Sequence, residues 1–186
     1  MSRKFSRSIV WAVCLVLASS LMLPSASQAR TAGEIDASVN AALDRFMKQV
    51  KGSKEFIQAA KGVLVFAGVY QAGAGIGGEY GEGALRIRGQ TVAYYKITSA
   101  SIGFQLGAQK KDIILVFLQD KALTDFRAKE GWQAGVDGSV VLVDQGAEAS
   151  LDTAKFNQPI VGFVVGQKGL MYKLTLDGSK ITKLKK

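Results

Sequence analysis

Glycine is the feature of this sequence that most constrains its fold. All 21 glycines lie after residue 32, and Pro159 is the only proline after residue 29. Such a chain, rich in glycine and almost without proline, is not typical of a disordered linker. Glycine inside a strand marks a place where another backbone approaches closely or where the strand bends. The composition therefore favours a β-rich fold whose strands are closely approached or sharply bent.

The densest glycine segment lies between residues 73 and 83. Gly73, Gly75 and Gly78 have the G-x-G-x-x-G spacing of a dinucleotide-binding loop. Such a loop must open a helix whose first turn faces the phosphates, and here the predicted structure continues as a strand. Alternate glycines instead share one face of a strand, which a neighbouring backbone can then approach. We therefore predict structural roles for Gly73, Gly75, Gly77, Gly78, Gly81 and Gly83.

The rest of the chain predicts helices at one end, one inserted helix and many short strands. Thr31 and Glu34 have the spacing of a capping box, and apolar residues then recur at helical spacing as far as Val50. Further helices are expected after Ser53 and from Asp120. Strand patterns cover residues 63–70, 84–87, 91–97, 102–109, 113–118, 132–143, 160–166, 170–176 and 179–184, with turns at Lys110-Lys111-Asp112 and Asp177-Gly178.

This pattern predicts the α+β class, with a mainly antiparallel, glycine-rich sheet that curves toward a barrel. Residues 160–166 and 170–176 are expected to form a closing pair of strands, and the turn at Asp177-Gly178 then leads into residues 179–184. No internal boundary is visible after residue 29, so we expect a single domain over residues 30–186. Its N-terminal region, residues 30–61, is expected to be helical, and residues 62–186 form the β-rich body.

The first 29 residues have the pattern of a secretory signal peptide. Three basic residues and no acidic residue precede an apolar run over residues 9–23, and Ser27 and Ala29 occupy the −3 and −1 positions of a cleavage site. The run is shorter than the about 20 residues that cross a bilayer. We expect cleavage between Ala29 and Arg30 and a product that is periplasmic or peripherally associated with the outer membrane. An uncleaved membrane anchor is the alternative.

Several kinds of catalytic site are excluded by composition. The chain contains no histidine, and Cys14, its only cysteine, lies in the predicted signal peptide. Ser-His-Asp and Cys-His catalysis, disulfides and zinc sites built from cysteine or histidine are therefore absent. Glu79 and Glu82 fall on opposite faces of a strand, so they do not form the carboxylate pair of a glycosidase. We expect a non-enzymatic protein without cofactor or metal.

Basic residues give the chain a formal net charge of +9, which falls to +6 when the three in residues 1–29 are removed. Basic residues that are clustered on a protein surface attract anionic lipid by about 1 kcal/mol for each residue near the membrane. Lys48 falls nearly opposite the apolar stripe of the first helix, so we expect the stripe to face the protein core and not lipid. A purely solvated basic face is the alternative. The candidate lipid-binding residues are Arg45, Lys48, Lys51, Lys54, Lys61, Lys110 and Lys111.

Ordered segments over about residues 54–185 resemble the SYLF family of lipid-binding domains. The resemblance is carried by residues 61–66 (KGVLVF), the glycine-rich 72–83, residues 101–109 (SIGFQLGAQ), 112–117 (DIILVF), 122–126 (ALTDF) and 132–140 (WQAGVDGSV). It implies binding to acidic lipid head groups, phosphoinositides in the eukaryotic members, without catalytic activity. The basic, amphipathic N-terminal region implicated in those proteins corresponds to residues 45–61.

We expect this chain to be exported and to have no SH3 domain, unlike the eukaryotic members. We therefore expect neither actin nor nucleic acid as a partner, and the expected ligands are the acidic lipids of a bacterial envelope: phosphatidylglycerol, cardiolipin or lipopolysaccharide phosphates. The predicted function is an exported, non-catalytic module that docks on acidic head groups through its basic clusters. Two alternatives stay open: an envelope structural or protein-interaction module without lipid specificity, and a small-molecule carrier with a pocket inside the curved sheet.

Overall fold

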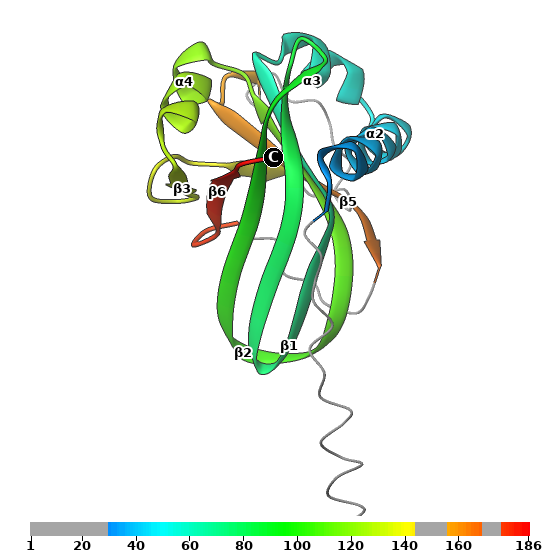
Figure 1. Cartoon of the computed structure of the whole chain (residues 1–186), viewed down its shortest axis with the longest axis vertical. Helices are drawn as coiled ribbons and strands as arrows, with labels where there is room; N and C mark the ends of the chain where they lie inside the picture. The colour runs from blue at the N-terminus through cyan, green and yellow to red at the C-terminus, as the bar shows by residue number, and fades with distance from the viewer. Residues whose placement is uncertain (1–29, 144–155, 169–175) are drawn as a thin grey trace, which may run out of the picture.

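The computed structural model describes residues 30–143, 156–168 and 176–186, with only the backbone described at residues 74, 75, 101–106 and 168. Three helices, α2 (Ala32–Gln49), α3 (Ser53–Ala59) and α4 (Asp120–Ala128), accompany one curled sheet (Figure 1). Its strands are β1 (Gly62–Ile87), β2 (Gln90–Phe117), β3 (Gly131–Gln133), β4 (Val141–Val143), β5 (Ile160–Lys168) and β6 (Lys180–Leu184).

The sheet is mainly antiparallel, which confirms the predicted fold class. Its strands follow the order β3-β6-β2-β5-β4, and β1 pairs with β2. Of these pairs only β4 with β5 is parallel. The strand β2 holds the sheet together because β6 pairs with its first part, Tyr94–Thr98, and β5 pairs with its last part, Lys110–Phe117.

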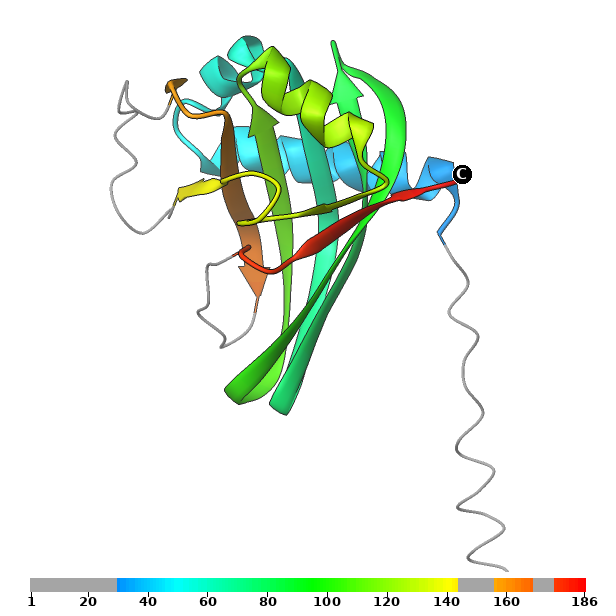
Figure 2. The same ribbon diagram turned by 90° about the vertical axis from the view of Figure 1, so that its left-hand side faces the viewer.

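Two long strands form a hairpin that is bent back on itself. The strands β1 and β2 stay paired from Gly62↔Phe117 to Ile87↔Gln90 and are joined by a tight turn. The register shifts between Ala74 and Ile76, where the ribbon folds over (Figures 1 and 2). A Cβ placed on Gly73 would lie 2.7 Å from the Cα of Gly77, on the opposite side of the fold. The two halves of β1 therefore face each other at backbone distance.

Apolar side chains cover both faces of this sheet. The outer face carries α2 and α3, whose Ile35, Val39, Phe46 and Phe56 are buried against strand residues such as Val65. The inner face is filled by a second cluster, which α4 and the β3–β6 pair close off (Figure 2). Its members include Leu64, Phe66, Tyr95, Ile97, Ile113, Phe117, Leu123, Phe126, Trp132 and Ile181.

The first helix begins as the sequence predicts. The Thr31 hydroxyl oxygen accepts from the backbone N–H of Glu34 (3.3 Å), and a Glu34 carboxylate oxygen accepts from the backbone N–H of Thr31 (2.7 Å), which confirms the capping box. These hydrogen bonds from Thr31 lower the pKa of Glu34. The apolar stripe of α2 is fully buried against the sheet, which confirms that it faces the protein core.

The prediction of a turn at Lys110-Lys111-Asp112 is wrong. These residues lie inside β2, where Lys110 pairs with Tyr70 and Lys111 pairs with Val69. Three consecutive charges do not end the strand here because the buried members have partners of opposite charge on other elements. For the same reason, the short strands predicted between residues 63 and 117 are parts of only two strands.

The ends of several helices and strands also differ from the sequence predictions. The N-terminal caps of α3 and α4 are Gly52 and Gln119, one residue before those expected. The single strand expected over residues 132–143 is two short strands separated by a turn. Among the described residues, β5 pairs with β2 and with β4. Most of its predicted partner, residues 170–176, lies outside the described residues.

Candidate functional site

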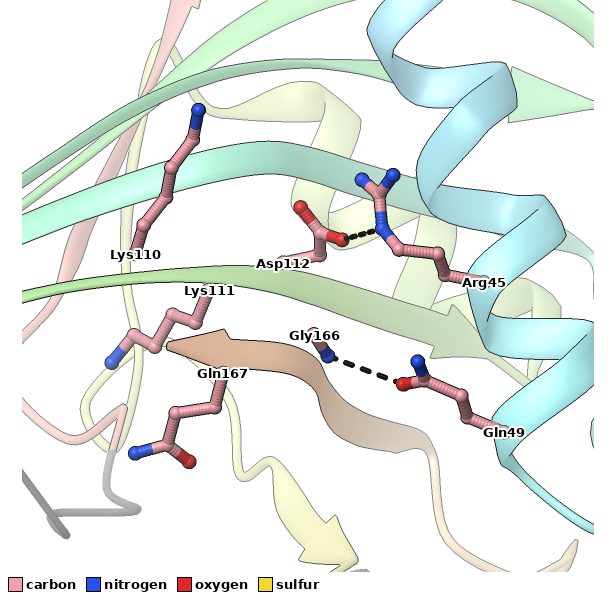
Figure 3. Close-up of a pocket in the computed structure, with 7 residues that line it drawn as sticks. All are labelled: Arg45, Gln49, Lys110, Lys111, Asp112, Gly166 and Gln167. Atoms are coloured by element: carbon pink, nitrogen blue, oxygen red, sulfur yellow. Dashed lines mark hydrogen bonds and ion pairs between the residues drawn. The ribbon is translucent and has the colours of Figure 1, made fainter. Parts of the chain in front are cut away.

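Two adjoining hollows lie between α2 and the outer face of the sheet. The first has a volume of about 390 Å³ and the second about 510 Å³. Arg45, Lys110 and Asp112 line both of them, and we call the combined feature the Arg45 groove. Figure 3 shows the residues that line the first hollow. The first hollow is completed by Gln49, Lys111, Gly166 and Gln167, and the second by Arg30, Ser38, Ala41, Ala67 and Gly68.

A buried carboxylate organises this groove. The side chain of Asp112 is only 5% exposed, and its Oδ2 accepts from Nε of Arg45 at 2.7 Å. Its Oδ1 accepts from the backbone N–H of Gly68, also at 2.7 Å. Gly68 presents this N–H because it lies at the register shift between Phe66 and Val69, with φ of +68°. Asp112 thereby fixes the arginine of a helix against the middle of a strand.

Two cationic groups of the groove stay open to a ligand. Among the described residues, neither the Nη atoms of Arg45 nor the ammonium of Lys110 has a hydrogen-bond or ion-pair partner. Figure 3 shows them on either side of Asp112, with their ends pointing in the same direction. Arg45 and Lys110 together carry one more positive charge than Asp112 neutralises, and Arg30 adds another in the second hollow. The arrangement suits an anion.

Lys111 has a different environment from its neighbour. Its side chain is 4% exposed and points to the inner face, where Nζ lies 2.8 Å from Oε2 of Glu79 and 3.2 Å from Oε1 of Gln71. Gln109 also donates to Gln71, at 2.6 Å. The charge of Lys111 is thus compensated inside the protein. The structure separates the predicted lysine pair, with Lys110 at the surface and Lys111 in a buried polar network.

The other candidate lysines lie outside the groove. Lys48, Lys51 and Lys54 are exposed on α2, on the following turn and on α3. Lys61 is half exposed, and its Nζ lies 3.7 Å from Asp120. Arg45 and Lys110 are therefore the two predicted residues that the fold brings together, although they are far apart in the sequence.

The predicted structural glycines lie along the folded hairpin. A Cβ on Gly81 would lie 2.7 Å from Val69, and one on Gly83 would lie 2.0 Å from the carbonyl oxygen of Val65. Around Gly78 there is more space, since the nearest atom lies at 3.8 Å. Gly73 faces Gly77 across the fold, and no side-chain environment is described at Gly75. No helix follows this segment, unlike in a dinucleotide-binding loop.

Sequence reasoning missed several groove residues. Asp112 was interpreted as part of a charged turn, and no sequence pattern marks Gln49 or Gly166, although the Gln49 side chain accepts from the backbone N–H of Gly166 at 3.3 Å. Within the described residues, no three acidic, cysteine or histidine side chains gather in a way that could hold a metal ion. No helix there is both long enough and apolar enough to cross a membrane.

Comparison with known proteins finds a family model that matches the second half of the chain. Residues 98–186 match the Ysc84 family, described as "Las17-binding protein actin regulator". Over 87 residues the chain is 31% identical to Beta cell expansion factor A of Aeromonas veronii. That alignment covers 47% of this chain and 32% of the relative, so the chain spans about a third of the relative's length. The family match includes Lys110, Asp112 and Gly166 but not Arg45.

Proposed function

We propose that this chain binds anionic lipid head groups in the Arg45 groove, because residues 98–186 match the Ysc84 family model and the sequence resembles the SYLF lipid-binding domains. It binds them without catalysing a reaction. The observation that carries the proposal is that the two Nη atoms of Arg45 and the ammonium of Lys110 line one hollow and have no partner among the described residues, while Asp112 binds only Nε of Arg45.

The chemistry of the two groups matches a phosphodiester. A guanidinium offers paired N–H donors that fit two phosphate oxygens, and an ammonium adds a point charge. Since Asp112 holds Arg45 through Nε, the two Nη atoms are left for a ligand. One phosphodiester carries one negative charge, which equals the surplus of Arg45 and Lys110 over Asp112. The groove is thus expected to prefer anionic over zwitterionic lipids.

The exposed lysines of the helical region have a supporting role in this proposal. Lys48, Lys51 and Lys54 are exposed but line neither hollow, so they attract an anionic surface without forming a specific site. Such attraction extends over a Debye length, about 8–10 Å at physiological salt. Lys111 has no direct role, because Glu79 compensates its charge.

The proposed setting is the bacterial envelope. We propose that residues 1–29 direct export and are removed, so that the ligands are phosphatidylglycerol, cardiolipin or lipopolysaccharide phosphates, and actin is not a partner. An intact mass that retained residues 1–29 in an envelope fraction would refute this part.

A carrier function finds no support, because the described part of the sheet interior is filled by apolar side chains and the Lys111 network.

The experiment is co-sedimentation with phosphatidylcholine vesicles that contain phosphatidylglycerol. It uses residues 30–186, which hold both core clusters, from Ile35 to Ile181, in full. Each cationic group near an anionic surface contributes about 1 kcal/mol, so Lys110→Gln is expected to weaken binding roughly fivefold. The double change of Lys110→Gln with Arg45→Gln is expected to weaken it by about 25-fold.

A matched control removes the same charge elsewhere. Lys180→Gln with Lys183→Gln changes two exposed lysines of β6, which lies across the sheet from α2 (Figure 1). We expect binding to fall less than twofold in that control. Because Arg45→Gln leaves Asp112 with one partner fewer, circular dichroism must show that the variant folds, and Lys110→Gln alone avoids this problem. Equal losses in both double variants would refute the groove as the site.

A further inference from the structure

The folded end of the hairpin carries no charge. We define the tip as residues 71–78 of β1 and 98–109 of β2, and neither stretch contains Asp, Glu, Lys or Arg. The tip projects from the body at the end of the molecule away from the helices (Figures 1 and 2). In the described sheet, the strand β1 pairs only with β2, and β5 and β6 pair with β2 outside residues 99–109. The tip is thus a two-stranded ribbon.

Large apolar side chains are exposed on this ribbon. Ile76, at the fold itself, is 73% exposed, and Tyr70 and Tyr80 are 55% and 50% exposed. Gly73 faces Gly77 and Gly81 faces Val69 across the fold, so the two tyrosines lie at the same level on the two arms. The described residues thus place an exposed isoleucine at the end of the molecule and a tyrosine on each side behind it.

Polar groups lie behind the two tyrosines, on the side away from the end of the tip. The Tyr80 hydroxyl donates to Oε1 of Glu82 at 2.8 Å, which directs it away from the end of the tip. Burial and this hydrogen bond raise the pKa of Tyr80 to about 12, so the phenol stays a donor at neutral pH. On the other arm, Lys110 is paired with Tyr70 across the strands, and paired residues share a face of the sheet.

We propose that the tip enters the interfacial layer of an anionic bilayer, with Ile76 deepest, the tyrosines at head-group level and Lys110 against phosphate. The inference rests on the proposed function and adds where the protein inserts. An uncharged segment followed by the tyrosines and then by Lys110 matches the layers of a membrane surface, and the buried Glu82 carboxylate behind Tyr80 has the ammonium of Lys186 at 3.7 Å. The groove lies directly behind the tip, because Lys110, which lines it, follows Gln109, the last residue of the tip.

The unpaired backbone groups of the tip limit how deeply it can enter the bilayer. Each outer edge of the ribbon exposes N–H and C=O groups without a strand partner, and such groups are costly in hydrocarbon. We therefore expect the tip to stop within about 5–10 Å of the head-group and acyl boundary, where water still reaches the edges. A second copy of the chain is the other possible occupant, but the basic residue behind the tyrosines favours an anionic lipid.

The test places a fluorescent label on the tip. Residues 30–186 contain no cysteine, so Ile76→Cys gives a single site for an environment-sensitive nitrobenzoxadiazole label. The control is Val136→Cys, because Val136 is 74% exposed and lies in the turn after β3. On adding phosphatidylglycerol vesicles we expect a blue shift of the label at position 76, with stronger quenching by a shallow nitroxide lipid than by a deep one. The label at position 136 should not change.

Three outcomes would overturn the inference. If the protein co-sediments but the label at position 76 does not respond, the tip does not insert and the groove proposal stands. If the labels at positions 76 and 136 respond alike, the insertion is not specific. If the label responds to protein concentration without vesicles, the occupant is a second copy. Absence of co-sedimentation would instead refute the proposed function itself.

A second variant tests the energetic contribution of the tip. Ile76→Ser removes an exposed apolar side chain, so the fold should be unaffected while vesicle binding weakens on the order of tenfold. Val136→Ser is the control and should bind as the unchanged protein does. Unchanged binding of Ile76→Ser would contradict a contribution of this side chain.

Discussion

Gly83 is the residue on which the bent hairpin depends most directly. A Cβ at this position would lie 2.0 Å from the carbonyl oxygen of Val65 and 2.8 Å from the Cα of Phe66. Both are backbone atoms of the facing half of β1, so they cannot swing aside as the end of a side chain can. Even one added methyl group therefore requires the two halves of the strand to separate.

We predict that Gly83→Ala lowers the free energy of unfolding by about 3 kcal/mol or more, since overpacking costs about 1–3 kcal/mol and backbone cannot yield easily. Gly78→Ala is the control, because its Cβ would have 3.8 Å of space, and it should change stability by less than about 0.5 kcal/mol. The measurement is urea unfolding followed by the fluorescence of Trp132, the only tryptophan of residues 30–186. Equal stability of the two variants would contradict the close-packing account.

The charged triplet at residues 110–112 shows how far single residues could be understood from the sequence. Successive side chains of a strand point to opposite faces, so Lys110 and Asp112 reach the groove while Lys111 reaches the interior. Their partners are distant in the sequence: Arg45 is 67 residues from Asp112. Local patterns predicted a solvated turn because no sequence window contains both members of either ion pair.

The helix α2 is the element that completes the groove. Its buried apolar face lies on the sheet, where the rings of Phe46 and Phe163 are 4.8 Å apart. Polar contacts add to this: Asp36 accepts from Thr91 at 2.7 Å and from Tyr94 at 2.8 Å. Arg45 precedes Phe46 in the chain, so the packing of the helix also determines where the guanidinium lies.

Shortening the Phe46 side chain should destabilise the protein strongly. Phe46 is fully buried, and a Phe→Ala change in a core costs about 3–5 kcal/mol, so we predict a loss in that range for Phe46→Ala. Met47, the next residue, is 42% exposed, and Met47→Ala should cost less than about 1 kcal/mol. Thermal or urea unfolding would measure both. Similar costs would show that α2 does not depend on its apolar face.

Among the elements, periodicity predicted the helices and the identity of the strand residues, but not the connections. The strand patterns predicted between residues 63 and 117 all lie within β1 and β2, although the turn predicted at residues 110–112 lies within β2 as well. The sequence did not show that these form two continuous strands, because register shifts such as the one between Phe66 and Val69 let the chain bend without losing its pairing. A pattern of alternating side chains breaks at a β-bulge in the same way as at a turn, so it does not distinguish the two.

The distribution of charge over the whole molecule joins the two proposals. The chain has a net charge of +9, or +6 without residues 1–29, yet the tip has none. Behind the tip lie Lys110 and the Nη atoms of Arg45, and the exposed Lys48, Lys51 and Lys54 line neither hollow. In this account electrostatic attraction brings the protein to an anionic surface, and the tip then enters the interface.

The most direct test is the binding of residues 30–186 to vesicles with and without phosphatidylglycerol at two salt concentrations. We predict binding to anionic vesicles alone at about 0.1 M salt, and at least a tenfold weaker affinity at about 0.5 M, where the Debye length is roughly halved. Co-sedimentation measures both. No binding to anionic vesicles at low salt would contradict the lipid function. Equal binding to neutral vesicles, unaffected by salt, would contradict recognition of the anionic head group by Arg45 and Lys110.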